Sequence, residues 1–359
     1  MQILLVSSFV LPHAGGVEQF VATIRRMLEE RGARVRVLAC ARPGEDGTAD
    51  AVVPARFVGG SGWPLPVGGW GALWREVGRA DAVIANNALH PLPALAVLAA
   101  RRRGVPALMV VHGSGEALQP GSPPFRALRG AFRSTLSRRA VRCSLPVSVS
   151  LAGVDGVRRN YGVAARHLPY PLPALEPVGP MAAPSDPLRV LWVGRLAPEK
   201  DPELAVAAVD RLVAVRPAVL EVLGDGRLRP RLEALAASRP WLNLRGSRPW
   251  PEVLAAQERA HAVLATSAWD NAQVALLEAL ARGVPAVSTR VGDAPRYLLE
   301  PSLARFCVDA GDAVALAAAL AELGDAYERW RPLFAANGER LRAIHGNAAD
   351  ALMELVTVA

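Results

Sequence analysis

Cysteine and aromatic residues are scarce in this sequence. It has three cysteines in 359 residues, Cys40, Cys143 and Cys307, and aromatic residues make up 5%. Three widely spaced cysteines exclude a disulfide framework and offer no metal-ligand spacing, so a reducing compartment is expected. No apolar run approaches the ~20 residues that span a bilayer, and no basic segment precedes the N-terminal apolar run. We therefore expect a cytoplasmic protein, neither secreted nor integral to a membrane.

Acidic residues are also in short supply. Lys and Arg number 41 against 33 Asp and Glu, which gives a formal net charge of +8. Such a charge favours anionic partners: phosphorylated metabolites, acidic lipid or nucleic acid. The basic residues lack interleaved aromatics and no recognition motif is present, so we expect no nucleic-acid partner.

Short apolar runs alternate with helical patterns along almost the whole chain. Runs that are apolar on both faces and separated by helices indicate parallel sheets. A Pro-rich stretch without periodicity interrupts the alternation and is typical of a linker. We predict a Rossmann-like domain over 1–170, a linker over 171–187, a second such domain over 188–340 and a helical tail over 341–359 that packs back on the first domain. The strands are expected within 2–8, 34–39, 81–86, 106–113, 145–150, 188–194, 218–224, 243–246, 260–267 and 284–290.

Several polar and glycine-rich segments follow these strands, where doubly wound sheets bind ligands. Gly15 and Gly16 open a helix, whose free N–H groups suit an anion, although a plain strand–helix turn has the same sequence. "VGRLAPEKD" places Arg195 and Lys200 beside Gly194, either as a phosphate site or as a solvated basic loop. "LGDG" at 223–226 is interpreted as a turn.

Two further features involve titratable residues. His112 ends a strand and is followed by Gly113 and Gly115, which places it at the edge of the sheet, although a lone histidine is more often structural. "WDNAQVALLEALARGVPAV" carries Asp270 just before a helix and Glu278 within it. Both carboxylates can line one edge of a cleft, or they can be a solvated cap residue and a surface residue.

Taken in this order, the segments resemble the retaining glycosyltransferases of family 4, which have the GT-B fold. The resemblance covers nearly the whole chain: "GGVE" at 15–18, His112, "VGRLAPEKD", "LGDG" and an acidic pair followed by "EALARGVPAV". The specific part is the family pattern E-x7-E with A-x-A-x-G-x-P. The resemblance implies two Rossmann-like domains that face each other across a cleft, the first for the acceptor and the second for a nucleotide sugar donor.

The resemblance also implies roles for single residues. Glu278 would bind the ribose hydroxyls, Asp270 hydroxyls of the donor sugar, and Arg195 with Lys200 the diphosphate. His112 would position the transferred sugar, so the catalytic set is His112, Arg195, Lys200 and Asp270. The implied donor-binding set is Gly15, Gly16, Gly194, Arg248, Asn271, Ala272, Gln273 and Glu278.

The sequence departs from the family pattern around the first acid. Asp270 stands where the family has Glu, and Ala272-Gln273 replaces the usual Phe-Gly. A side chain one methylene shorter must shift its contact with the sugar, so we expect selectivity for a sugar unlike ordinary glucose, unless Asp270 simply does the work of Glu. "PYPLP" at 169–173 replaces the family's turn before the linker.

The chemistry expected from these residues needs no metal ion and no cofactor. No DxD-like pair follows a strand, and Arg195 and Lys200 can neutralise a leaving diphosphate. The resemblance implies front-face attack, in which the phosphate takes the acceptor's proton and Asp270 binds rather than attacks. The acceptor would be a hydroxyl of a small molecule, a natural product or a lipid or cell-envelope glycan.

A basic segment over 125–142 carries six arginines and no acid, with Phe125, Leu128, Phe132 and Leu136 at helical spacing. It predicts either a core-packed helix with a solvated basic face or an interfacial helix that touches anionic lipid, and hence a membrane-peripheral protein. Two other functions stay open: a sugar-nucleotide epimerase or hydrolase of the same fold, and a catalytically silent nucleotide-sugar-binding protein.

Overall fold

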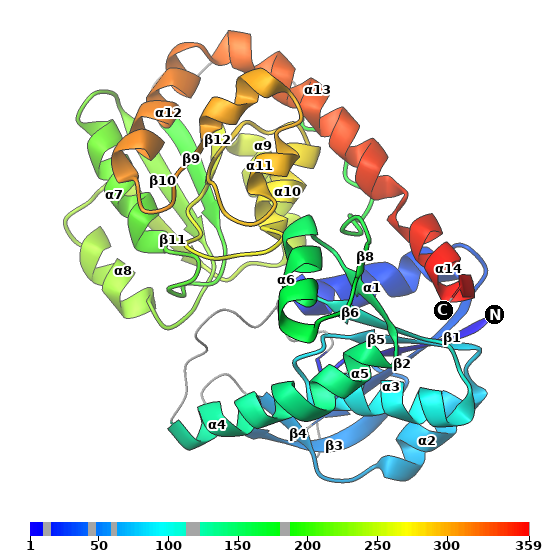
Figure 1. Cartoon of the computed structure of the whole chain (residues 1–359). Helices are drawn as coiled ribbons and strands as arrows, with labels where there is room; N and C mark the ends of the chain where they lie inside the picture. Colours follow the sequence, from blue (N-terminus) through cyan, green and yellow to red (C-terminus); the bar gives the residue numbers. More distant parts are fainter. Residues whose placement is uncertain (10–15, 42–47, 59–62, 113–122, 180–186, 359) are drawn as a thin grey trace. The chain divides into compact units, whose positions relative to one another are not determined.

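The structure is a computed structural model that describes residues 1–9, 16–41, 48–58, 63–112, 123–179 and 187–358 (Figure 1). The chain divides into two compact units. Unit 1 comprises Met1–Pro173 and His345–Ala359, and unit 2 comprises Ala174–Ile344. Among the described residues, no helix combines the length and apolarity needed to cross a membrane.

Unit 1 is built on a sheet whose described strands run in the order β4-β3-β2-β1-β5-β6-β7-β8. All pairs are parallel except β3 with β4. The strands are β1 (Gln2–Val6), β2 (Arg34–Ala41), β3 (Ala51–Val58), β4 (Trp63–Pro66), β5 (Ala82–Asn86), β6 (Ala107–Val111), β7 (Leu145–Ser148) and β8 (Arg166–His167).

Helices cover both faces of this sheet (Figure 1). On one face α2 packs against α3, which contacts η1 and α5, while α1 and α14 contact each other on the opposite face. The helices are α1 (Gly16–Glu29), α2 (Trp70–Arg79), α3 (Pro91–Arg103), α4 (Pro123–Phe132), the π-helix η1 (Arg133–Ser137), α5 (Arg138–Arg142), α6 (Leu151–Tyr161) and α14 (Ala348–Val358). β1, β5 and β6 are buried almost throughout, as expected for central parallel strands.

Unit 2 has a parallel sheet of order β11-β10-β9-β12-β13-β14. Its strands are β9 (Leu188–Val193), β10 (Ala218–Leu223), β11 (Leu242–Gly246), β12 (Ala262–Ala265), β13 (Ala286–Thr289) and β14 (Cys307–Val308). Its helices are α7 (Pro202–Val213), α8 (Arg229–Ala236), α9 (Trp250–Arg259), α10 (Val274–Ala281), α11 (Ala294–Tyr297), the 3-10 helix η2 (Pro301–Phe306), α12 (Ala313–Asp325) and α13 (Tyr327–Gly346), whose last two residues belong to unit 1.

Each unit has a point where the strand order reverses. β1 lies between β2 and β5 in unit 1, and β9 lies between β10 and β12 in unit 2. Ligands of doubly wound sheets bind beyond the carboxyl ends of the strands at such points. A ligand site is therefore expected among the residues that follow β1, β5 and β6 in unit 1, and among those that follow β9 and β12 in unit 2.

The end of the chain is fastened to unit 1. The Arg31 guanidinium donates to both carboxylate oxygens of Asp350 in α14, at 2.5 and 3.0 Å. His345 Nδ1 lies 2.9 Å from the carbonyl oxygen of Tyr170. Leu352 is fully buried, so α14 contributes to the interior of this unit.

The segment 125–142 does not form one helix with a single apolar face. α4 runs into the π-helix η1, whose wider turn directs the polar Ser137 inward, where its hydroxyl donates to the Ala88 carbonyl at 2.6 Å. Phe132 and Leu136 pack against the core of unit 1, whereas Leu128 is 48% exposed. Phe125, Phe132 and Leu136 therefore pack inward, as in the alternative of a core-packed helix, and Leu128 is the member of the predicted apolar set that does not.

Candidate functional site

The loop after β9 holds Gly194, Arg195 and Lys200, the first group of predicted donor residues. Arg195 is 68% exposed and pairs with Glu199, four residues on, at 3.0 Å. The Lys200 ammonium, 25% exposed, instead pairs with the carboxylate of Asp270. The two cations lie in one loop, but each holds a different carboxylate.

Two glycines of "LGDG" are required by this loop. A Cβ on Gly224 (φ 145°) would lie 1.8 Å from the carbonyl oxygen of Gly194. A Cβ on Gly226 (φ 155°) would lie 2.6 Å from the carbonyl oxygen of Leu196. The interpretation of this motif as a turn was incomplete, because the glycines also let two strand-end loops touch through their backbones.

Hydrogen bonds connect the same loop to the segment after β12. The carbonyl of Glu199 accepts from the backbone N–H groups of Ala268 and Trp269 at 3.1 and 3.2 Å. The Thr266 hydroxyl accepts from the Trp192 indole at 2.9 Å, and its own proton is shared between the carbonyls of Asp201 and Lys200, at 2.7 and 3.1 Å. The Lys200–Asp270 ion pair therefore lies on a braced backbone at the switch point of the sheet.

The segment from Asp270 to Gln273 leads into α10. The carboxylate of Asp270 accepts from the N–H of Asn271 at 2.8 Å, and the carbonyl of Ala272 accepts from the Tyr297 hydroxyl at 2.6 Å. Gln273 adopts a left-handed backbone (φ 37°), and its side chain donates to the Val291 carbonyl at 2.9 Å instead of capping the helix. The first turn of α10 thus lacks a side-chain cap among the described residues, and its N–H groups suit an anion.

Glu278 lies in the second turn of α10 and is only 6% exposed. Burial raises the pKa of its carboxyl from 4.5 to about 7, against the opposing effects of the Trp250 indole and the Arg282 guanidinium. The alternative of a surface residue is therefore wrong. A buried carboxyl with a raised pKa at a strand-end edge is typical of a functional site.

The remaining predicted donor residue of unit 2 is Arg248, just beyond β11. Its guanidinium is 43% exposed and lies 3.8 Å from the carboxylate of Glu252. Trp250, which influences the pKa of Glu278, lies two residues further on.

In unit 1, His112 follows β6 directly. Its Nε2 lies 2.5 Å from Oδ1 of Asn86, whose amide nitrogen donates to the Ser7 hydroxyl at 3.2 Å. This amide orientation assigns the imidazole proton to Nε2. Burial lowers the pKa of His112 to about 4, so the ring is neutral at pH 7. Gly16 is the first residue of α1, and Gly15 lies outside the described residues.

The sequence interpretation missed several residues that hold the site. Asn86 orients His112, Thr266 braces Lys200, and Tyr297 holds Ala272. Asn86 ends a predicted strand and could have been noticed there, in the same way as His112. Tyr297 offered no signal, since it is 25 residues from its partner in the chain.

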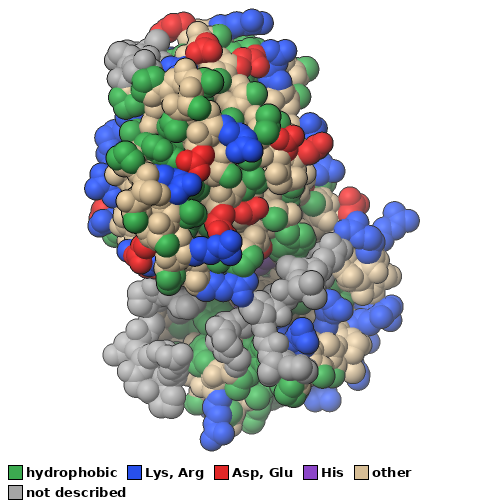
Figure 2. Space-filling view, turned by 90° about the vertical axis from the view of Figure 1, so that its left-hand side faces the viewer, with side chains coloured by type: hydrophobic (Ala, Val, Ile, Leu, Met, Phe, Trp, Pro, Cys, Tyr) green, Lys and Arg blue, Asp and Glu red, His purple; other side chains and the backbone are tan. Residues whose placement is uncertain are grey.

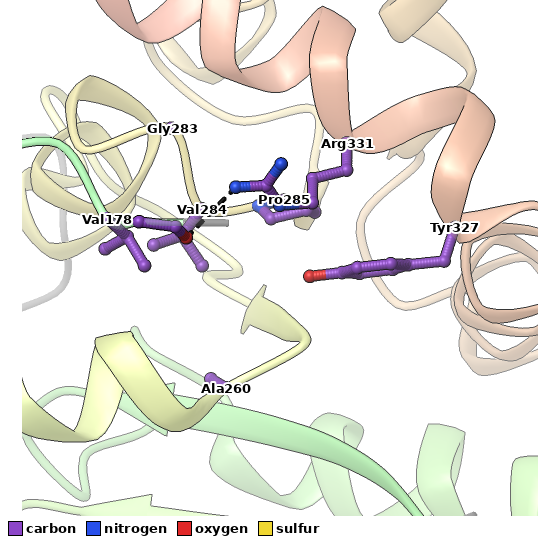
Figure 3. A pocket seen from close by; sticks show the side chains of 8 residues that line it. Val178, Ala260, Gly283, Val284, Pro285, Tyr327 and Arg331 are labelled. Atoms are coloured by element: carbon purple, nitrogen blue, oxygen red, sulfur yellow. Dashed lines mark hydrogen bonds between the residues drawn. The ribbon is translucent and has the colours of Figure 1, made fainter. Parts of the chain in front are cut away.

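Two hollows of unit 2 lie away from this edge. The pocket in Figure 3 is lined by residues such as Ala260, Pro285, Tyr327 and Arg331. Ala260 and Pro285 precede their strands, and the pocket offers about 10 Å³, room for a single water. A larger hollow of about 580 Å³ lies between α9 and strands β9 to β11, where Arg245 pairs with Glu221 at 3.3 Å. Neither contains the predicted donor residues.

Comparison with known protein families matches both parts of the chain. Residues 14–169 match the family described as Glycosyltransferase Family 4, and residues 187–325 match Glycosyl transferases group 1. The second match contains the Lys200–Asp270 pair and Glu278, and the first contains His112.

Curated relatives match parts of the chain. WcaL of Salmonella typhimurium, named as a glycosyltransferase of colanic acid biosynthesis, is 34% identical over 150 residues, which are 39% of this chain and 37% of WcaL. Glycogen synthase of Mycobacterium tuberculosis is 28% identical over 265 residues, which are 69% of this chain and 61% of the relative. The chain thus spans less than two thirds of the length of each of these relatives.

Solved structures share the fold. Sucrose-phosphate synthase of Thermosynechococcus elongatus superimposes with a TM-score of 0.76 at 18% identity, over 99% of this chain and 98% of the other. HepE of Anabaena, solved in complex with UDP and glucose, gives a TM-score of 0.75 at 17% identity over both full chains. With the two family matches, these findings show that the chain belongs to the GT-B glycosyltransferases of the family 4 type.

Proposed function

We propose that the chain is a retaining, metal-independent glycosyltransferase that moves a sugar from a nucleotide diphosphate sugar to a hydroxyl acceptor. The observation that carries the proposal is the Lys200–Asp270 ion pair, which precedes the uncapped first turn of α10. Glu278 is buried one turn further along the same helix. The Lys200 ammonium, the N–H groups of the first turn of α10 and the buried Glu278 carboxyl therefore all belong to the segments that follow β9 and β12.

This arrangement suits a diphosphate leaving group. Negative charge grows on the phosphate oxygens as the glycosidic bond breaks, and fixed cations or N–H groups stabilise that charge. Lys200 and Arg195 now hold Asp270 and Glu199, so donor phosphates share or replace these carboxylates as ligands of the cations. The Lys200–Asp270 pair lies on a hydrogen-bonded backbone, so the ammonium is held in place before the donor arrives.

His112 acts in this proposal as a neutral group. With a pKa of about 4, its imidazole carries no proton on one ring nitrogen at pH 7, while Nε2 donates to Asn86. It therefore positions a hydroxyl of the transferred sugar and does not serve as an acid. The acceptor hydroxyl attacks from the side on which the diphosphate departs, and a phosphate oxygen takes its proton. Asp270 binds sugar hydroxyls and forms no bond to the sugar.

The acceptor in this proposal is a hydroxyl of a saccharide, a lipid-linked glycan or another small molecule. The relatives' names refer to colanic acid and glycogen, both polysaccharides. HepE and related structures contain UDP or UDP-glucose. A panel of nucleotide sugars based on UDP, GDP and ADP is therefore the first set of donors to assay.

The ion pair provides the direct test. Lys200→Ala should lower turnover by about 10²–10³, the usual effect of losing one electrostatic donor to a developing charge. Lys200→Arg, which keeps the charge, should retain part of the rate, and Glu278→Ala should weaken donor binding. Nucleoside diphosphate release with and without acceptor is the measurement. Wild-type kinetics in both alanine variants, or an epimerised nucleotide as the product, would contradict the proposal.

A second prediction concerns metal ions. Because Lys200 and Arg195 neutralise the leaving group, excess EDTA should leave initial rates within about a factor of two, or ~0.4 kcal/mol in the barrier. Loss of activity that magnesium or manganese restores would show that the diphosphate is held differently.

A further inference from the structure

One helical layer of unit 1 is strongly basic. The helices α2, α3 and α4 to α5 contain two, three and six arginines, and Glu76 is their only acidic residue. Glu76 is 6% exposed and pairs with Arg36 at 2.7 Å and Arg79 at 3.6 Å. On the face that Figure 2 shows, blue side chains outnumber red ones among the coloured atoms of the lower part.

The opposite layer of the same sheet has a different charge. In α1 and α14, three acidic residues with described side chains accompany two arginines: Glu29, Asp350 and Glu354 with Arg25 and Arg26. The positive charge of these helices is therefore concentrated on one side of the sheet.

The basic layer also exposes large apolar side chains. Trp70 and Trp74 are 51% and 42% exposed, and their spacing places both on the outward side of α2. Leu65 and Val67, just before the helix, are 37% and 54% exposed. Indole rings are rarely left in water without a function, and tryptophan prefers the boundary between lipid and water.

A basic and an aromatic side chain meet on this layer. The guanidinium of Arg103, at the end of α3, lies 4.2 Å from the ring centroid of Trp74. Gly78 leaves room for this arrangement, since a Cβ there would lie 2.4 Å from Nη1 of Arg103. We call this region the α2 surface, defined by Leu65, Val67, Trp70, Trp74, Arg75 and Arg103.

We propose that the α2 surface binds a membrane that contains anionic lipid. Its arginines are attracted to lipid phosphates, and its two indoles with Leu65 and Val67 enter the interface. Segment 125–142 is the other candidate for membrane contact, but most of its apolar side chains pack in the core. Phe125 is 9% exposed, and Phe132 and Leu136 pack inward. It adds charge around the surface but offers only Leu128 to lipid.

Sedimentation of the full chain with vesicles tests the proposal. Binding is expected to vesicles of phosphatidylcholine with phosphatidylglycerol, and to be much weaker with phosphatidylcholine alone. Trp70→Ser with Trp74→Ser should lower the partition coefficient about tenfold or more. Arg75→Ala should lower it about fivefold. The single tryptophan variants provide intermediate values if the double variant folds poorly.

Matched controls separate this surface from general charge and exposure. Val215→Ser removes an apolar side chain that is 74% exposed in unit 2, and Arg211→Ala removes an exposed arginine of α7. Both should bind vesicles as the wild type does. Equal binding by the double tryptophan variant would overturn the proposal. So would binding to heparin or a short oligonucleotide that matches vesicle binding and is unaffected by the loss of both tryptophans.

Discussion

Glu278 is a residue whose charge depends on its surroundings. Its raised pKa, about 7 against an ordinary 4.5, means that the folded chain favours the neutral carboxyl. A carboxylate accepts hydrogen bonds from sugar hydroxyls more strongly than a neutral acid does. If Glu278 binds the ribose, donor affinity should increase between pH 6 and pH 8, where this group loses its proton.

The same raised pKa predicts an effect on stability. An acid whose pKa is higher in the folded chain lowers the stability of the fold as the pH rises from about 4.5 to 7, with no further change above. Glu278→Gln should therefore gain stability relative to the wild type over this range. The gain should not exceed a few kcal/mol, since each tenfold change in proton affinity corresponds to about 1.4 kcal/mol. Urea unfolding at pH 5 and pH 8, without donor, measures the difference. A constant difference would show that burial does not raise the pKa of Glu278. His112, whose pKa burial lowers from 6.5 to about 4, makes both proteins less stable as the pH falls below 6.5, and this effect cancels in the difference between them.

At the scale of loops and helices, the sequence predicts the positions of the central strands better than it predicts contacts between side chains. The strands β1, β5, β6 and β9 follow from apolar runs, but β3 and β4 were not predicted. Both contain proline, which interrupts a strand pattern. β4 is the edge strand of the sheet, where a missing N–H costs little, and Pro54 of β3 stands at the last register position with β2, just before the pairing with β4 begins. The Lys200–Asp270 pair was also not predicted, because its members are 70 residues apart in the chain.

The glycine of the loop after β10 gives a test at this scale. Gly224→Ala should destabilise the chain by more than about 3 kcal/mol and weaken donor binding at least tenfold, because the new Cβ displaces the Gly194 loop. Gly311→Ala is the matched control: its φ is 83°, but nothing lies within 4 Å of a Cβ there. It should cost only about 1 kcal/mol of conformational strain. Similar losses in both variants, measured by urea unfolding, would mean that the crowding at Gly194 has no effect.

At the scale of the whole molecule, the end of the chain completes the unit in which the chain begins. Leu352 of α14 is fully buried in unit 1, and Leu320 of α12 is fully buried in unit 2. Leu352→Ala should lower the stability of unit 1 by about 2–5 kcal/mol, the usual cost of such a cavity. Hydrogen exchange should then become faster in α1 and β6, which α14 contacts, while α7 and β10 keep their protection.

Leu320→Ala should produce the reverse pattern, with faster exchange in α7, which packs against α12. The predicted donor residues after β9 and β12 belong to unit 2. Nucleoside diphosphate binding should therefore survive Leu352→Ala and weaken in Leu320→Ala. Uniformly faster exchange in both units for either variant would show that the chain opens as one cooperative structure. In that case the tail would support the donor site as much as it supports unit 1, and the two substitutions would weaken nucleotide binding alike.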